Sequence, residues 1–157
     1  KNLSDDITPT IPVISHSIKF VNDNFRKVDY ACCIYATAPF LETKYLKEGL
    51  DKIMKYKPNY TFSATSYSFP IQRAIKITKE KRSKMFYPEF QDTRSQDLEE
   101  AFHDAGQFYW GKSEAWLKGL KMHTDGVSIK IPSWRALDID TNEDWEKAEK
   151  IFKGNLL

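Results

Sequence analysis

The sequence predicts an α/β layer fold with a mostly parallel sheet. Short apolar runs of strand length alternate with amphipathic stretches of helix length, and this alternation is typical of right-handed βαβ units. The chain has 157 residues, of which 41% are hydrophobic and 14% aromatic, and this is enough to build the core of one domain. We therefore expect a single folded unit.

The chain begins with a predicted helix followed by a strand. Thr10, with Pro12 shortly after it, marks the start of a helix whose apolar residues recur at spacings of three and four. That stripe consists of Ile11, Ile14, Ile18, Val21 and Phe25. Residues 30–35 form a nearly unbroken apolar run, which is typical of a strand covered on both faces in a parallel sheet.

The next segments repeat this order and then break it. A second helix is expected to open at Thr43 and to close before Pro58, and residues 60–67 predict another strand. Residues 69–104 are polar and charged, and they interrupt the alternation. We expect this stretch to leave the sheet and to carry substrate or subunit contacts.

The last third of the chain predicts three short strands and a helix. The strands are expected at residues 106–110, 128–132 and 136–139. Thr141 and Asp144 have the spacing of a capping box, which marks the start of the helix. Its predicted buried stripe consists of Trp145, Ala148, Ile151 and Phe152.

The charge balance and the cysteines exclude several classes of function. Lysine and arginine number 24 against 22 acidic residues, so the net charge of +2 favours neither nucleic acid nor an anionic membrane as partner. No apolar run has the length of a membrane span, and no secretory signal opens the chain, so we expect a cytoplasmic protein. Cys32 and Cys33 are adjacent, which favours reduced thiols in the interior.

Asp138 and Asp140 are the strongest candidates for a metal site. Side chains alternate along a strand, so two aspartates one residue apart would point the same way at the end of the strand predicted over 136–139. Carboxylate oxygens suit Mg²⁺, which takes one or two carboxylates and leaves its other positions to water and phosphates. A nucleotide is then the natural third component. The alternative is that both aspartates cap a helix or pair with lysines.

Other polar residues follow the predicted strands. Arg73 and Arg94 could bind a carboxylate or phosphate in a bidentate manner, although each could also be an ordinary surface arginine. The three histidines, His16, His103 and His123, lack the spacing of metal ligands, and we expect them on a helix face, in a loop and in a loop.

Three segments in this order resemble the acylneuraminate cytidylyltransferase family: residues 32–41 (CCIYATAPFL), residues 104–111 (DAGQFYWG) and residues 138–145 (DIDTNEDW). The resemblance covers nearly the whole chain. Within that family, the sequences of residues 35–40 (YATAPF), 69–74 (FPIQRA) and 93–100 (TRSQDLEE) are most similar to the pseudaminic acid branch.

The resemblance implies both a fold and a reaction. The fold would be the three-layer, Rossmann-like nucleotide-diphospho-sugar transferase fold. The reaction would transfer CMP from CTP to a nonulosonic acid, here pseudaminic acid, releasing pyrophosphate with Mg²⁺ as cofactor, in a homodimer that serves cell-surface or flagellin glycosylation. Sialic, legionaminic or 3-deoxy-octulosonic acid as the sugar, a non-catalytic dimeric fragment, and an unrelated α/β domain remain alternatives.

The resemblance also implies roles for individual residues. Asp138 and Asp140 fall on the metal-binding, catalytic aspartates of the family. Thr10 falls near a position that touches the nucleotide base, and Tyr35 stands where the sialic acid branch commonly has glutamine. The implied substrate-binding residues are Thr10, Tyr35, Thr37, Arg73, Arg94 and Gln107, with the two arginines and Gln107 at the sugar.

One part of the family pattern is absent from the chain. Family members open with a first strand and a glycine-rich loop that contains arginine and lysine and holds the triphosphate. The six glycines here form no such phosphate cradle. We therefore expect residues 1–157 to be a single, N-terminally truncated cytidylyltransferase domain that by itself turns over little or nothing.

Overall fold

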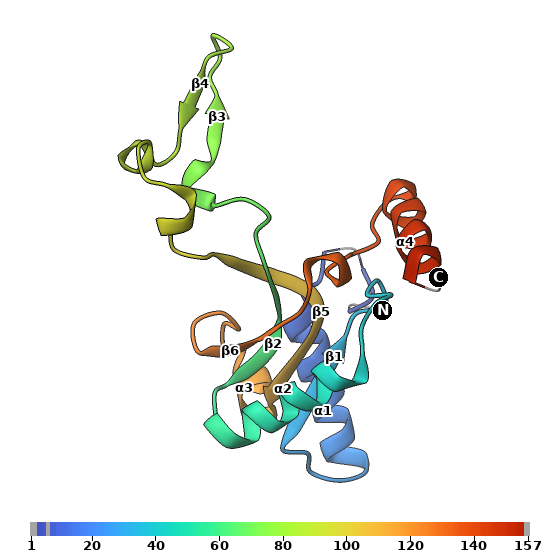
Figure 1. Cartoon of the computed structure of the whole chain (residues 1–157). Coiled ribbons are helices and arrows are strands. Elements are labelled where there is room, and N and C mark those ends of the chain that lie inside the picture. Colours follow the sequence, from blue (N-terminus) through green and yellow to red (C-terminus); the bar gives the residue numbers. More distant parts are fainter. Residues whose placement is uncertain (1–2, 6, 156–157) are drawn as a thin grey trace.

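The body of the protein is a four-stranded sheet with helices on both faces. The computed structural model describes residues 3–5 and 7–155, and its sheet has the strand order β1-β5-β2-β6 (Figure 1). These strands span Tyr30–Ile34 (β1), Tyr60–Ser66 (β2), Phe102–Lys112 (β5) and Gly126–Lys130 (β6). β5 is antiparallel to both of its neighbours and β6 is parallel to β2, so β1, β2 and β6 share one direction.

The helices form the two outer layers. α1 (Thr10–Asn24) and the short α3 (Ser113–Lys118) pack on one face through a core that contains Ile18, Tyr60 and Trp116. α2 (Thr43–Tyr56) covers the other face, where Tyr45 packs with Phe108. The predicted three-layer α/β fold is confirmed, and so are the limits of α1 and α2 to within a residue or two.

The position of β1 differs from the sequence prediction. Residues 30–35 were expected to form a strand covered on both faces in a parallel sheet, but β1 lies at an edge and pairs antiparallel with β5. Its side chains are only partly buried, and that of Ile34 is exposed. Strand order depends on which distant segment inserts between two strands, and β5 inserts between β1 and β2.

The strand predicted over residues 136–139 is wrong. Pairing with β2 ends at Ile131, whose N–H donates to the carbonyl of Ala64 at 2.9 Å. Pro132 has no N–H to continue the ladder, and a 3₁₀ turn follows at Ser133–Arg135. The chain then runs without regular structure into α4 (Asn142–Asn155), and Leu137 is buried in a small cluster with Phe40.

The start of α4 matches the prediction, but its packing does not. The Asp144 N–H donates to Thr141 Oγ1 at 3.2 Å and the Thr141 N–H donates to Asp144 Oδ2 at 2.9 Å, which is a reciprocal capping box. Of the predicted buried stripe, Ala148 is buried. The side chains of Trp145 and Phe152 are 58% and 57% exposed, so α4 covers the body with only part of its apolar face.

Residues 67–101 leave the sheet and form a separate arm (Figure 1). The arm contains a two-stranded hairpin of β3 (Ile75–Ile77) and β4 (Ser83–Met85), with 3₁₀ turns at Ile71–Arg73, Pro88–Phe90 and Ser95–Asp97. None of its residues is buried. The predicted excursion from the sheet is therefore present, although β5 already begins at Phe102. None of the described helices has the length and apolar character needed to cross a membrane.

Candidate functional site

The candidate site is built around a large bulge in β5. Phe62 faces Tyr109 and Ala64 faces Asp104, where an unbroken antiparallel register would place Gln107, so β5 has three more residues than β2 in this interval. Ser63 Oγ accepts a hydrogen bond from the Gln107 N–H at 3.2 Å inside the bulge. Bulges of this kind re-aim side chains and often lie beside active sites.

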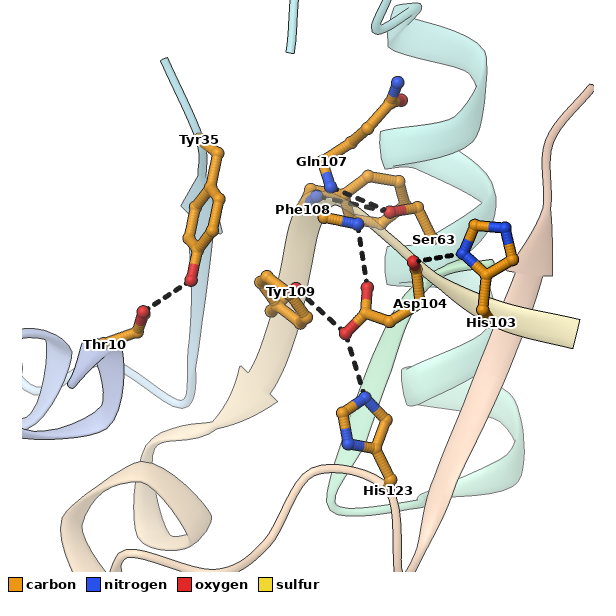
Figure 2. A network of polar contacts seen from close by, with 10 residues as sticks. Thr10, Tyr35, Ser63, His103, Asp104, Gln107, Phe108, Tyr109 and His123 are labelled. Carbon is orange, nitrogen blue, oxygen red and sulfur yellow. Dashed lines mark hydrogen bonds and ion pairs between the residues drawn. The ribbon is translucent and has the colours of Figure 1, made fainter. Parts of the chain in front are cut away.

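Three polar groups contact the carboxylate of Asp104 at this bulge (Figure 2). The Tyr109 hydroxyl donates to Oδ2 at 2.9 Å, and His123 Nε2 lies 2.9 Å from the same oxygen. The Gly106 N–H donates to Oδ1 at 2.9 Å. Gly106 has φ +62°, a conformation that favours glycine, so the residue type at 106 allows the backbone to turn back onto the carboxylate.

Tyr109 links the Asp104 cluster, which consists of Asp104, Gly106, Tyr109 and His123, to the end of β1. Burial first, and then the negative charge of Asp104, raise the pKa of the Tyr109 hydroxyl well above its usual value, so the phenol stays protonated and donates. Its ring lies 5.4 Å from the ring of Tyr35, centroid to centroid. The Tyr35 hydroxyl in turn lies 2.5 Å from Thr10 Oγ1 in the first turn of α1 (Figure 2).

Two of the residues predicted to bind substrate therefore lie together, and a third is adjacent. Thr10 and Tyr35 are hydrogen-bonded although they are 25 residues apart in the chain. Thr37 lies in the turn that follows β1, where the Ala38 N–H donates to the Tyr35 carbonyl at 3.3 Å.

Gln107 comes from the same bulge but points away from Asp104 (Figure 2). Only 1% of Gln107 is exposed. Its Nε2 donates to the carbonyl of Arg135, and its buried Oε1 has no partner among the described residues. In this structure Gln107 holds the turn at Ser133–Arg135, and its predicted contact with the sugar stays a prediction.

Asp138 and Asp140 are both exposed and follow that turn. Asp138 Oδ2 lies 3.6 Å from the point where a Cβ on Gly106 would be, so Asp138 is beside the bulge. Within residues 3–5 and 7–155 neither carboxylate has an ion pair, and the cap of α4 is made by Thr141 and Asp144 instead. The helix-cap and lysine-pair alternatives for the two aspartates therefore lack support.

The donor set at the two aspartates is compatible with Mg²⁺. No group of three or more histidine, cysteine or acidic side chains that could hold a metal occurs in the described part of the chain. Mg²⁺ does not need one, because it commonly takes one or two carboxylates and completes its shell with water and substrate phosphates. Asp138 and Asp140 supply two exposed carboxylates, but they lie outside any strand, so the strand alternation that predicted a common direction for them does not apply, and the shared ion stays a prediction.

The two candidate arginines belong to the arm. Arg73 donates from Nη1 to the Gln91 carbonyl at 2.7 Å and from Nη2 to the Thr93 carbonyl, so it holds the arm together. Arg94 Nε lies 2.7 Å from Asp97 Oδ2. Both arginines thus contact residues of the arm, and within residues 3–5 and 7–155 neither has a hydrogen bond or ion pair with Thr10, Tyr35 or Asp104.

The histidines and cysteines are placed as follows. His16 is on an exposed face of α1 and His123 is in a loop, as predicted. The loop prediction for His103 is wrong, because this residue lies on β5, which extends further toward the arm than its apolar core indicates. Cys32 and Cys33 are free thiols, as predicted, but both are only partly buried.

Sequence reasoning missed four residues of this site: Asp104, Tyr109, His123 and Arg135. Each acts through a partner that is remote in sequence or lies across a bulge, and a single sequence does not reveal such pairs. The clearest signal was the Asp104-Ala105-Gly106 string itself, because aspartate side chains in turns often accept a hydrogen bond from the backbone two residues on.

Comparisons with known proteins give a consistent result. The chain matches no protein-family model. It is 37% identical over 156 residues to a pseudaminic acid cytidylyltransferase of Campylobacter jejuni subsp. jejuni serotype O:2, an alignment that covers 99% of this chain and 67% of that relative. A protein of the same name from serotype O:23/36 aligns equally well. The N-acylneuraminate cytidylyltransferase B of Danio rerio is 27% identical over 140 residues, covering 87% of this chain and 33% of that relative.

Proposed function

The chain belongs to the pseudaminic acid cytidylyltransferase family, and from this premise we propose that it transfers CMP from CTP to pseudaminic acid. The observation that carries the proposal is the 37% identity, which extends over 99% of the chain and 67% of the relative. Members of this family are nucleotidyltransferases that act on nonulosonic acids. The choice of pseudaminic acid as the sugar, the metal, the dimer and a cytoplasmic location are the finer parts of the proposal.

In the proposed reaction, the anomeric hydroxyl of the sugar attacks the α-phosphorus of CTP. A new P–O bond forms to the sugar oxygen, the bond to the bridging oxygen breaks, and pyrophosphate leaves. The hydroxyl proton is released. Such a displacement is accelerated chiefly by orientation of the two substrates and by stabilisation of the charge on the phosphates.

Asp138 and Asp140 would hold Mg²⁺ through their exposed carboxylates, because no other residue of the described chain neutralises them in an ion pair. When bound, the ion would neutralise phosphate charge and orient the leaving group. A Cβ at position 106 would lie in ordinary van der Waals contact with Asp138 Oδ2, so glycine is favoured there by its φ of +62° and not by a need for space.

Thr10, Tyr35 and Thr37 would contact the nucleotide from the ends of α1 and β1. Ligands in open α/β sheets bind outside the carboxyl ends of the strands, and Tyr35 directly follows β1 at such an end. The Asp104 cluster would support this side, because Tyr109 holds the Tyr35 ring while it donates to Asp104. Gln107 would contact the sugar through Oε1, which has no partner among the described residues, while Nε2 keeps its bond to the Arg135 carbonyl.

Arg73 and Arg94 would approach the sugar carboxylate from the arm, which we propose to be the contact surface of a homodimer. Large apolar side chains are exposed along the arm, among them Phe69 (82%), Ile75 (56%) and Ile77 (65%). A two-stranded hairpin is marginally stable by itself, so a partner that covers these residues would stabilise it. Asp97 engages only Nε of Arg94, so the rest of the guanidinium can bind a carboxylate.

A sugar panel tests the proposed function. The protein is expressed from its complete reading frame and incubated with CTP, Mg²⁺ and, separately, pseudaminic, legionaminic, sialic and 3-deoxy-octulosonic acid, and pyrophosphate release is followed. We expect the highest kcat/KM with pseudaminic acid. Exclusive use of sialic acid would overturn the choice of sugar, and no release with any of the four would overturn CMP transfer itself.

A further inference from the structure

We propose that Arg135 is a positioning residue that fastens the Asp138–Asp140 segment to the turn after β1 and to the bulge of β5. The inference rests on the proposed function of the two aspartates. It does not make Arg135 a group that touches substrate. The proposal comes from three contacts that meet at this one residue.

The guanidinium of Arg135 reaches the segment that follows β1. Nη1 donates to the Phe40 carbonyl at 3.0 Å, and Nη2 lies 2.9 Å from Glu42 Oε1. The side chain is 18% exposed, and the guanidinium lies 4.1 Å from the centre of the Trp134 ring. The pKa of Glu42 is lowered, chiefly by a hydrogen bond with Lys44 and further by the charge of Arg135, so this carboxylate stays ionised at neutral pH.

The backbone of Arg135 reaches the bulge. Its carbonyl accepts a hydrogen bond from Nε2 of Gln107, whose side chain is almost completely buried. One residue therefore joins three segments that are far apart in sequence, since Arg135 is 95 residues from Phe40 and 28 from Gln107.

These bonds lie immediately before the aspartates. The 3₁₀ turn at Ser133–Arg135 ends with the Ala136 N–H donating to the Ser133 carbonyl at 3.1 Å, and Leu137 then packs into the cluster with Phe40. From Ala136 to Asp140 the chain has no sheet partner, so no strand ladder fixes where Asp138 and Asp140 lie. The contacts of Arg135 hold this segment in place instead, and they set the distance between the aspartates and the end of β1.

An arginine suits this position and a lysine does not. Its planar fork presents separate nitrogens to a carbonyl and a carboxylate on different residues, whereas an ammonium is a single point charge on a flexible stem. Arg135→Lys therefore keeps the charge and removes the bridge. Arg26 is exposed just after α1, so Arg26→Lys is a matched control that makes the same substitution elsewhere.

The test uses the protein from its complete reading frame and measures three quantities: thermal stability, the Mg²⁺ concentration for half-maximal rate, and hydrogen exchange of the amides of residues 136–141. We expect Arg135→Lys to fold, to need at least tenfold more Mg²⁺ for half-maximal rate, and to exchange faster at 136–141. Glu42→Gln should shift the Mg²⁺ requirement in the same direction, and the double variant should add little to Arg135→Lys alone.

Unchanged exchange at 136–141 in Arg135→Lys, or an unchanged Mg²⁺ requirement, would overturn the proposal. A loss of melting temperature with parent-like Mg²⁺ dependence would also overturn it, because that result describes a purely structural residue. If the parent protein makes no CMP-sugar, the proposed function fails, and the exchange experiment still decides whether Arg135 anchors the segment.

Discussion

The body and the arm belong to one chain but are stabilised in different ways. Every buried side chain among the described residues lies in the body, and none lies between Tyr67 and Asp104. The arm instead exposes Phe69, Ile75 and Ile77. The body therefore has a buried core, although it also exposes apolar side chains such as Trp145 and Phe152, whereas the arm has no buried residue and exposes an apolar surface that a partner can cover.

The contacts inside the arm are mainly polar. Arg73 donates to two backbone carbonyls, and the Phe86 N–H donates to the Ala74 carbonyl at 2.9 Å. Such bonds define a local shape but contribute less to stability than burial of large apolar side chains. Substitutions in the body should therefore affect folding, and substitutions in the arm should affect association.

The largest expected effect is in the body, at Trp116. This side chain is fully buried, packs edge-on against Tyr60 and donates from Nε1 to the Ala31 carbonyl at 3.2 Å. Trp116→Ala should lower the free energy of unfolding by about 3–5 kcal/mol, measured by denaturant titration. Phe69→Ala is the control in the arm, and an equal loss in that variant would contradict the distinction between body and arm.

The next effect is on association and concerns β3. Ile75 and Ile77 point to one side of the hairpin and Lys76 to the other, because side chains alternate along a strand. Changing both isoleucines to serine should raise the dimer dissociation constant at least about tenfold in sedimentation experiments. The free energy of unfolding of the subunit should change by less than about 0.5 kcal/mol.

Lys76→Ser is the control for that pair, and it should leave association nearly unchanged. A parent protein that stays monomeric at all accessible concentrations would contradict the proposed role of the arm.

A smaller effect is expected in the body, where stability depends on pH through the thiol of Cys32. Burial, and to a lesser extent the neighbouring Cys33, raise the pKa of Cys32 from 9.0 to about 12. Because the folded thiol holds its proton more tightly than the unfolded one, its contribution to stability is fully present below pH 9 and is lost as the pH rises toward 12. Cys32→Ala should therefore lose stability less steeply than the parent above pH 9 in denaturant titrations. Parallel curves would contradict burial of this thiol.

The smallest effect is expected at the cap of α4, which lies at the periphery of the body. Thr141→Ala removes the hydroxyl that accepts the Asp144 N–H, at a cost of about 1 kcal/mol. The loss should appear as faster hydrogen exchange in the first turn of α4. Thr141→Ser keeps the hydroxyl and should exchange like the parent, and equal exchange in both variants would contradict the capping box.

The sequence predicted the parts of the fold that depend on neighbouring residues. The limits of α1 and α2 and the Thr141–Asp144 cap follow from local periodicity and local hydrogen bonding. The pairing of β1 with β5 did not follow, because it depends on a segment more than 70 residues away. The strand predicted over 136–139 failed because an extended apolar stretch looks the same with or without a sheet partner.

The same division holds for the site. Asp138 and Asp140 were visible as a pair in the sequence. Asp104 and Arg135 were not, because their partners His123 and Phe40 are fixed only by tertiary structure.

The most direct test of the central claim is the rate of pyrophosphate release from CTP and pseudaminic acid, measured against Mg²⁺ in aspartate variants of the protein from its complete reading frame. Asp138→Asn and Asp140→Asn should each lower the rate roughly a hundredfold at limiting Mg²⁺. Asp51→Asn, at an exposed position of α2, should leave it unchanged. Parent-like rates in both variants would contradict the assignment of the metal and the CMP transfer to this pair.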